Sequence, residues 1–427
     1  MSAVLVLLGM LALILLNVPI AVAIGVAGVL GMLAEGGTIT LLNAALTLFD
    51  AATNFPLIAI PLFILAGALM NTSSISRRLI AFVSALVGFV RGGLAMVNVG
   101  VSMFFAEISG SAVADVAATG SVLIPAMKRR GYKPALAAAI TSSSASLAII
   151  IPPSIPMILY GALADTSVVQ LFVAGIVPGV VGGLAMMALC WWFAVRYDLP
   201  REEAFDLRRL WSTFRDAAWA LALPVIILGG IFGGIVTATE GAGLAVVAAL
   251  AIGGVVYREL DWRTLYAAMI DGVVQTAVVM LLVATSAVLG LYLTETQVPQ
   301  HLAEWMTGLT QNKWMVLALL NLLLLVVGMF LHGAAAIILV VPIVLPLVRQ
   351  VGIDPLHFGI VVTLNLAVGQ QTPPVASVLV TACSIAKADI WSVTKINVWF
   401  IGLLLGVLLM VTYVPAVPLF LVELFYR

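Results

Sequence analysis

Long apolar runs restrict what this sequence can fold into more than any other feature. Stretches of about 20 residues without a charged side chain recur along the chain, and each is long enough to cross a bilayer as a helix. Hydrophobic residues make up 63% of the 427 residues and charged residues 9%, whereas a soluble domain has about 25% charged residues. A soluble globule is excluded, and an all-α polytopic membrane protein is predicted.

The apolar runs predict nine full spans. They are expected at 3–34, 54–70, 134–164, 169–195, 219–236, 241–257, 268–293, 355–386 and 394–423. The first is expected to be one retained, long or tilted helix, bent near Asn17-Val18-Pro19, because it lacks the basic segment and short apolar core of a signal peptide.

Two further apolar stretches, 92–127 and 314–349, are too long for one span. Small or polar residues interrupt each near its middle: Ser109-Gly110-Ser111 in the first and His332-Gly333 in the second. We interpret each as a re-entrant helical hairpin, which is tolerated only where protein or a water-filled cavity covers the tip.

The basic residues test this topology. With a cytoplasmic N-terminus and re-entrant hairpins, sixteen of the nineteen Lys and Arg residues are cytoplasmic, and only Lys313, Arg349 and Arg427 are outside. This agrees with the positive-inside rule and predicts a periplasmic C-terminus. Residues 197–218 show apolar residues at helical spacing among arginines, which predicts a cytoplasmic interfacial helix; a plain solvated linker is the alternative.

The chain contains an internal repeat with a constant offset between its two halves. Four prolines of the first half coincide with prolines of the second, whereas chance predicts about 0.06 coincidences over that stretch. The pairs are Pro125 with Pro346, Pro134 with Pro355, Pro152 with Pro373 and Pro153 with Pro374. We therefore divide the chain into a first repeat (1–196), a linking helix and span (197–240) and a second repeat (241–427).

An odd number of crossings separates the repeats, so the second is expected to be inverted. Each repeat has a hairpin followed by a helix that a Pro-Pro pair breaks, 134–164 in the first and 355–386 in the second. Inverted repeats with broken helices indicate a secondary transporter with its binding site near the bilayer midplane. A duplicated structural membrane protein is the alternative.

The breaks and hairpin tips supply the candidate sites. Proline leaves backbone carbonyls without partners, and carbonyl and hydroxyl oxygens suit a hard cation such as sodium. The candidate sodium ligands are Ser109, Gly110, Ser111 and Ser146 at one site and Gly328, Gly333, Gly369 and Thr372 at the other. The candidate substrate residues are Asp115, Ser144, Asn365, Gln371 and His332. Each Gly or Ser alone is explained as well by close helix packing, and Asp115 and His332 each also have a structural explanation.

Several linked motifs resemble the large membrane subunit of tripartite ATP-independent periplasmic (TRAP) transporters. They are Glu107-Ile-Ser-Gly-Ser-Ala-Val-Ala-Asp115, Ile124-Pro-Ala-Met-Lys-Arg-Arg-Gly-Tyr132 and Ile151-Pro-Pro-Ser-Ile-Pro-Met-Ile-Leu-Tyr-Gly161, with Pro342-Ile-Val-Leu-Pro346, Gly352-Ile-Asp-Pro355 and Thr372-Pro-Pro-Val375 in the second half. The resemblance covers nearly the whole chain. One departure is His332, where the family often has an acidic residue.

The resemblance implies a multi-pass protein of the bacterial inner membrane and sodium-coupled symport of a small organic acid by an elevator mechanism. It also implies two partners, a small membrane (Q-type) subunit expected as a separate chain and a periplasmic substrate-binding protein. No cofactor and no nucleic-acid partner is expected. A stand-alone ion-coupled carrier remains the alternative function. An ATP-driven permease is disfavoured because the chain has no P-loop, and a membrane enzyme because it has no catalytic motif.

Overall fold

The computed structural model describes residues 3–16, 18–72, 74–109, 111–201 and 204–426. These residues form helices and connecting loops, with no strand among them. Nine of the described helical segments are long and apolar enough to cross a membrane. The predicted all-α polytopic class is therefore confirmed.

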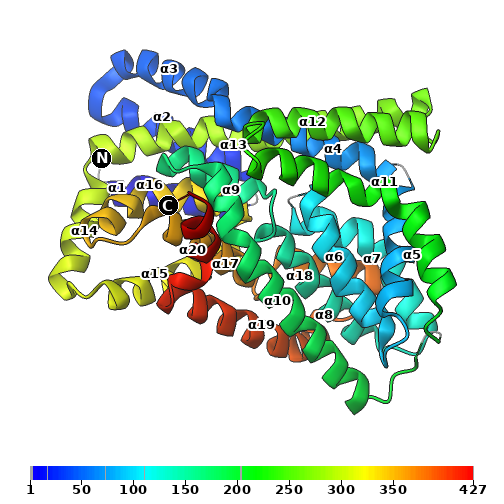
Figure 1. Cartoon of the computed structure of the whole chain (residues 1–427). Helices are drawn as coiled ribbons and strands as arrows, with labels where there is room; N and C mark the ends of the chain where they lie inside the picture. The colour runs from blue at the N-terminus through cyan, green and yellow to red at the C-terminus, as the bar shows by residue number, and fades with distance from the viewer. Residues whose placement is uncertain (1–2, 17, 73, 110, 202–203, 427) are drawn as a thin grey trace.

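The two repeats follow each other in the same helix order (Figure 1). The first contains α2 (Ile20–Gly36), α3 (Thr40–Thr53), α4 (Ala59–Thr72), α5 (Ile75–Val87), α6 (Gly93–Ser109), α7 (Ala112–Arg129), α8 (Pro134–Ala145), α9 (Ile155–Ala164) and α10 (Val168–Arg196). The second contains α12 (Ala238–Leu250) with the π-helical η4 (Ala251–Val256), α13 (Trp262–Glu295), α14 (Val298–Leu309), α15 (Lys313–Phe330), α16 (Gly333–Gln350), α17 (Pro355–Gly369), α18 (Ser377–Ala386) and α19 (Ile390–Tyr413).

The repeats differ at α13, which is continuous where the first repeat has α3 and α4. Pro56 follows the end of α3, and proline disfavours the helical conformation of the residue before it. The repeat-equivalent position is Ala277, inside α13. The helix α3 was not among the predicted spans.

The prediction of one first span over 3–34 is wrong. That segment forms two helices, α1 (Ala3–Leu15) and α2, which pack against each other. Ala3 and Glu35 line the same cavity beside α14, so the chain reverses near Pro19 instead of bending through one crossing. Proline cannot donate the backbone hydrogen bond that a continuous helix needs there.

Two further predicted boundaries change. The predicted span 394–423 is divided at Val414 and Pro415 into α19 and α20 (Ala416–Tyr426). The predicted interfacial helix and the span after it form one unbroken helix, α11 (Leu207–Phe232).

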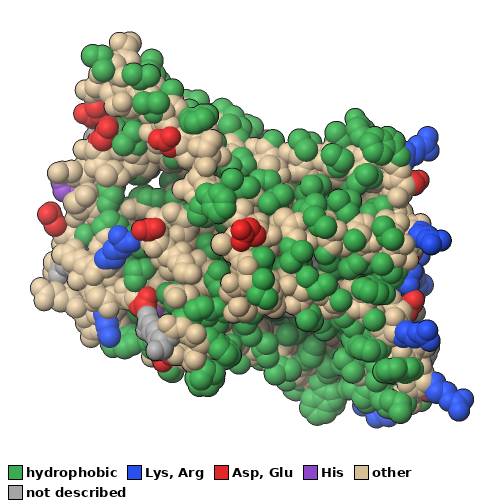
Figure 2. Space-filling view, turned by 45° about the horizontal axis from the view of Figure 1, so that its top comes forward, with side chains coloured by type: hydrophobic (Ala, Val, Ile, Leu, Met, Phe, Trp, Pro, Cys, Tyr) green, Lys and Arg blue, Asp and Glu red, His purple; other side chains and the backbone are tan. Residues whose placement is uncertain are grey.

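Lys and Arg side chains gather at one end of the molecule, at the right of Figure 2, with a broad hydrophobic surface beside them. Arg91 pairs with Asp198 at this end, where α10 ends. The cavity shared by Ala3 and Glu35 lies at the other end, near α14 at the left of Figure 1. If the basic end faces the cytoplasm, as the positive-inside rule requires, the N-terminus lies on the opposite side of the membrane. The two predictions of a cytoplasmic N-terminus and cytoplasmic basic residues are therefore incompatible in this fold.

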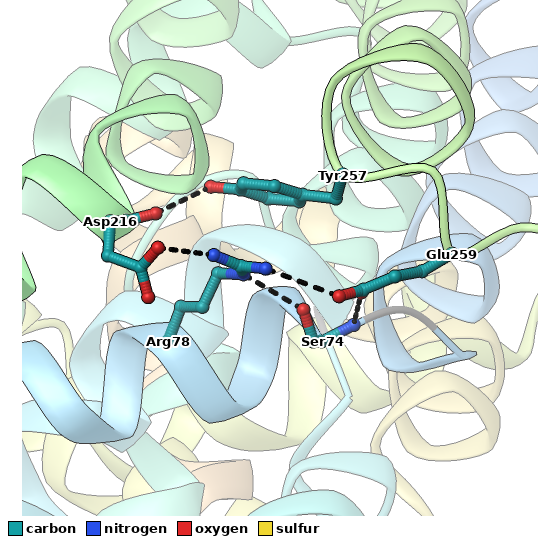
Figure 3. A network of polar contacts seen from close by, with 5 residues as sticks. All are labelled: Ser74, Arg78, Asp216, Tyr257 and Glu259. Carbon is teal, nitrogen blue, oxygen red and sulfur yellow. Dashed lines mark hydrogen bonds and ion pairs between the residues drawn. The ribbon is translucent and has the colours of Figure 1, made fainter.

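Arg78 joins three elements at the basic end (Figure 3). Its guanidinium on α5 pairs with Asp216 of α11 and with Glu259, 3.2 Å away, and lies 4.0 Å from the ring centre of Tyr257. Partial burial alone would raise the pKa of Glu259, but hydrogen bonds from Ser74 and Arg78 outweigh it and hold that pKa below its usual value. The cluster ties α5, which precedes the first hairpin, to α11 and to the loop before α13.

Candidate functional site

The first broken helix consists of α8, a short 3-10 turn η3 (Ser146–Ile149) and α9. The gap between η3 and α9 contains Pro152 and Pro153. The Ser154 hydroxyl donates to the Ile149 carbonyl across this gap at 2.7 Å, which satisfies one carbonyl that the break would leave without a partner.

The second broken helix consists of α17 and α18, with the gap between Gly369 and Ser377. Within it, the Thr372 amide donates to the Gly369 carbonyl at 2.9 Å, and the Thr372 hydroxyl donates to the Val368 carbonyl at 2.9 Å. The backbone therefore turns tightly just before Pro373 and Pro374.

The four predicted residues of the second site lie around this break. A Cβ placed on Gly369 would come within 2.7 Å of the Gly328 backbone, so the two main chains touch. A Cβ on Gly333 would come within 2.8 Å of the Gln370 side chain and 3.9 Å of Pro156. Because Pro156 belongs to α9, the tip of the second hairpin reaches the half-helix of the first repeat.

The predicted residues of the first site are only partly described. Ser109 ends α6, Ser111 is the N-cap of α7, and Gly110 lies outside the described residues. The Ser111 carbonyl accepts the Asp115 amide at 2.9 Å. Ser146 is fully buried and its hydroxyl donates to the Ser142 carbonyl at 3.1 Å.

Each broken helix is hydrogen-bonded to the first arm of its own hairpin through an asparagine. The Ser144 hydroxyl on α8 donates to Oδ1 of Asn98 on α6 at 2.9 Å. At the repeat-equivalent position, Asn365 on α17 donates through Nδ2 to Oδ1 of Asn321 on α15 at 2.7 Å. All four side chains are buried, so these bonds fix each broken helix against its hairpin.

A third polar contact joins the two repeats directly. The Ser143 hydroxyl of α8 lies 2.8 Å from Oε1 of Gln371 in the second break and 2.7 Å from Oδ1 of Asn397 on α19. A hydroxyl has one proton, so it donates to one of these oxygens at a time. The side-chain Nδ2 of Asn397 also donates to the backbone carbonyl of Gln371 at 3.3 Å.

Three of the predicted substrate residues, Ser144, Asn365 and Gln371, are fully buried and bonded to protein in this conformation. Asp115 is also fully buried. His332 is the N-cap of α16 and is exposed. Asn98, Asn321 and Asn397 were not predicted, although a lone amide inside an apolar run was a usable signal.

Each hairpin also contacts the C-terminal end of a half-helix that belongs to the other repeat. The Lys128 ammonium at the end of α7 donates to the Ala386 carbonyl at the end of α18, at 3.0 Å. The Arg349 guanidinium, at the repeat-equivalent position on α16, donates to the Ala164 carbonyl at the end of α9, at 2.9 Å. A cation at a helix C-terminus satisfies free carbonyls and favours the helix dipole. Each hairpin is thus attached to the opposite repeat.

The model of one protein family matches this chain over residues 7–417: the tripartite ATP-independent periplasmic transporter, DctM component. The chain belongs to this family. It is the large permease component of a TRAP transporter, a multi-pass membrane protein and not an enzyme. This confirms the resemblance seen in the sequence motifs.

Named relatives agree with the family match. The isethionate TRAP transporter permease protein DctMQ of Oleidesulfovibrio alaskensis is 42% identical over 95% of this chain, which spans 64% of that protein. The C4-dicarboxylate TRAP transporter large permease protein DctM of Pseudomonas aeruginosa is 39% identical over 88% of each chain. The sialic acid TRAP transporter permease protein SiaT of Haemophilus influenzae is 36% identical over 87% of this chain and 60% of its own length.

A solved structure shares the fold. The YdaH transporter of Alcanivorax borkumensis, described as having an unusual topology, superposes with a TM-score of 0.63 over 89% of each chain at 16% identity. The similarity concerns the arrangement of helices alone.

Proposed function

We propose that this chain forms the translocation path for sodium-coupled uptake of a small organic anion by an elevator-type movement. The observation that carries the proposal is the meeting of the two repeats: Gly333 at the tip of the second hairpin lies beside both Gln370 and Pro156. Two breaks and a hairpin tip at one place provide backbone carbonyls for a cation, and the half-helix N-termini favour an anion.

The substrate class follows from the relatives. Their names specify isethionate, C4-dicarboxylates, 2,3-diketo-L-gulonate and sialic acid, which are all organic anions. We infer an organic anion for this chain, with Asp115, Ser144, Asn365, Gln371 and His332 as candidate contacts in a more open conformation.

The partners follow from the family. We infer that a small membrane subunit assembles with this permease and that a periplasmic binding protein delivers the substrate. We also infer that the basic end faces the cytoplasm of an inner membrane, which places Ala3 on the periplasmic side.

The proposal predicts that uptake into proteoliposomes needs sodium, the small subunit and the binding protein together. Thr372→Val and Ser111→Ala each remove one hydroxyl, so each is expected to raise the sodium concentration for half-maximal uptake about 5- to 150-fold, equivalent to about 1–3 kcal/mol. Thr363→Val is the matched control, because Thr363 is a buried threonine of α17 whose hydroxyl bonds to the Gly359 and Ile360 carbonyls of its own helix.

Uptake of free substrate by the permease alone would support the stand-alone carrier instead. Wild-type sodium dependence in both variants would contradict the assigned ligands, and uptake driven by a proton gradient without sodium would contradict sodium coupling.

A further inference from the structure

A cavity lies beside the first hairpin, toward the basic end of the molecule. Its volume is about 450 Å³, within the range of about 300–1,000 Å³ that is usual for small-molecule sites. One wall is α7, from Ala114 to Val122, and the other walls are α4, the start of α5 and α13. Because α7 packs against α6, α8 and α18, whereas α4 packs against α12 and α13, the cavity separates two groups of helices.

The cavity extends from near the hairpin tip toward the basic end. Ala114 lies in the first turn of α7, just after the N-cap Ser111, and Val122 lies farther along the same helix. With a rise of 1.5 Å per residue, the wall formed by α7 is about 12 Å long. Arg77, in the first turn of α5, lines the same cavity. A small molecule in the cavity can therefore lie between the hairpin and this arginine.

Arg77 is the only charged side chain among the described residues that line the cavity. It is exposed and forms no ion pair with a described residue, whereas the adjacent Arg78 is paired with Asp216 and Glu259 (Figure 3). A guanidinium carries five N–H donors in a planar fork that matches a carboxylate in two parallel hydrogen bonds. Arg77 therefore has its full donor capacity available to an anion.

Uncharged donors accompany this arginine. The side-chain amides of Asn71 and Gln275 and the hydroxyl of Ser76 line the same cavity, and each can donate a hydrogen bond to an anionic oxygen. No acidic residue is among the described residues of the lining, so no carboxylate of the cavity wall competes for Arg77. One cation with a few convergent donors is the arrangement expected of an anion site.

The equivalent junction of the second repeat has no comparable space. There the second arm of the other hairpin, α16, meets α13 and the start of α14 around a void of about 10 Å³. The position equivalent to Ala118 is Leu339, which fills the junction, and the position equivalent to Arg77 is Val298. The cavity and its cation are thus features of the basic end alone.

We propose that this cavity binds the organic anion on the cytoplasmic side of the first hairpin, with Arg77 pairing with its carboxylate or sulfonate group. The inference rests on the proposed function and deepens it, because none of the candidate substrate residues near the breaks is a lysine or an arginine. Arg77 supplies the positive charge that an anion leaving the breaks toward the cytoplasm requires.

The first test measures how the cavity discriminates between probes of opposite charge. The purified full-length chain carries Ser121→Cys in the cavity wall, and the native Cys190 and Cys383 are replaced. Its thiol is labelled with anionic sulfonatoethyl methanethiosulfonate and, separately, with the cationic trimethylammonioethyl reagent. Arg77→Gln is expected to lower the ratio of the anionic to the cationic labelling rate about fivefold, because it removes a unit charge near the thiol. Arg77→Lys keeps the charge and is expected to keep most of the ratio.

The second test measures binding as protection of the same thiol. Sodium ethanesulfonate, which carries the charged group of the anionic reagent without its reactive end, is expected to slow labelling by the neutral N-ethylmaleimide. Sodium chloride at the same concentration is the reference, so the sodium concentration is constant. Arg77→Gln is expected to abolish the protection.

The matched control is Arg208→Gln. Arg208 is an exposed arginine of α11 at the same end of the molecule, and it is not among the residues that line the cavity. The substitution removes the same charge, and both the rate ratio and the protection are expected to stay as they are with Arg208 in place.

An unchanged rate ratio in Arg77→Gln, or no protection by ethanesulfonate, would overturn the site. If either result is found while the assembled transporter takes up an organic anion with sodium, this inference fails and the proposed function stands. If ethanesulfonate protects through Arg77 but the assembled transporter takes up no organic anion, the proposed function fails and the cavity is an anion site without a transport role.

Discussion

Two glycines determine how closely the second hairpin approaches the second break. The Gly328 and Gly369 backbones are in contact, and no Cβ fits between them without moving main-chain atoms. A backbone cannot yield as a flexible side chain does, so overpacking here is costly. The close approach is consistent with the packing role that small residues have in membranes, and it also brings main-chain carbonyls near the break.

Gly369→Ala is therefore expected to lower the free energy of unfolding by about 1–3 kcal/mol. Gly402→Ala on α19 is the control, because a Cβ there meets nothing within 4 Å, and replacing glycine by alanine in a helix stabilises it by up to about 1 kcal/mol. Reversible unfolding in detergent micelles measures both. Equal effects of the two substitutions would contradict the backbone contact.

A repeat or a proline marked some positions that lie close together in the fold. Gly328 was selected near a hairpin tip and Gly369 and Thr372 in a helix break, and the structure places the Gly328 and Gly369 backbones in contact, with Thr372 bonded to Gly369; their role as sodium ligands stays a prediction. Asn98 and Asn321 were not predicted, because their partners lie on helices far away in the chain. Sequence spacing does not show which helix a lone amide will face.

The crossed contacts of Lys128 and Arg349 operate at the scale of helices. Each attaches a hairpin to the C-terminus of a half-helix in the opposite repeat. The two hairpins and the half-helices α9 and α18 are thereby linked into one unit, and the free N-termini of both half-helices are held at the central breaks.

Lys128→Met is expected to lower the free energy of unfolding by about 0.3–1 kcal/mol, because the C-terminus of α18 loses the cation that donates to its Ala386 carbonyl. Lys128→Arg keeps the charge and is expected to retain most of the stability. Arg129→Met is the control, since Arg129 is the next residue of the same helix, carries the same charge and is exposed as Lys128 is. If Lys128→Met and Arg129→Met unfold alike, the contact contributes nothing.

Helix boundaries were predicted well where a proline pair interrupts an apolar run and poorly where a single proline does. Pro152-Pro153 and Pro373-Pro374 lie in the gaps of the broken helices, as expected. The chain reverses near Pro19, helix α19 ends just before Pro415, and helix α11 continues through Pro224. A single proline removes one hydrogen bond, and tertiary packing decides whether the helix bends, ends or continues.

In the whole molecule, basic residues gather at one end and the chain reverses near Pro19. Together these two features predict which segments lie on each side of the membrane. Single cysteines at Val4 and Glu304 are expected to be labelled from one side of the membrane, and a cysteine at Arg208 from the other. The native Cys190 and Cys383 are both buried and are replaced first. Labelling with a membrane-impermeant maleimide measures this.

Labelling of Val4→Cys and Arg208→Cys from the same side would contradict the antiparallel arrangement of α1 and α2. Arg130→Cys serves as a second marker of the basic end, because Arg130 follows α7, beside the Lys128 contact.

The membrane class, the two repeats, the hairpins and the broken helices were all predictable from the amino-acid order, because apolar length, charge distribution and proline position act locally along the chain. Other features became visible only in the folded molecule: α1 folds back on α2, Ser143 meets Gln371, and each hairpin contacts a half-helix of the opposite repeat. These features depend on contacts between segments distant in sequence, and such contacts are set by how the helices pack together.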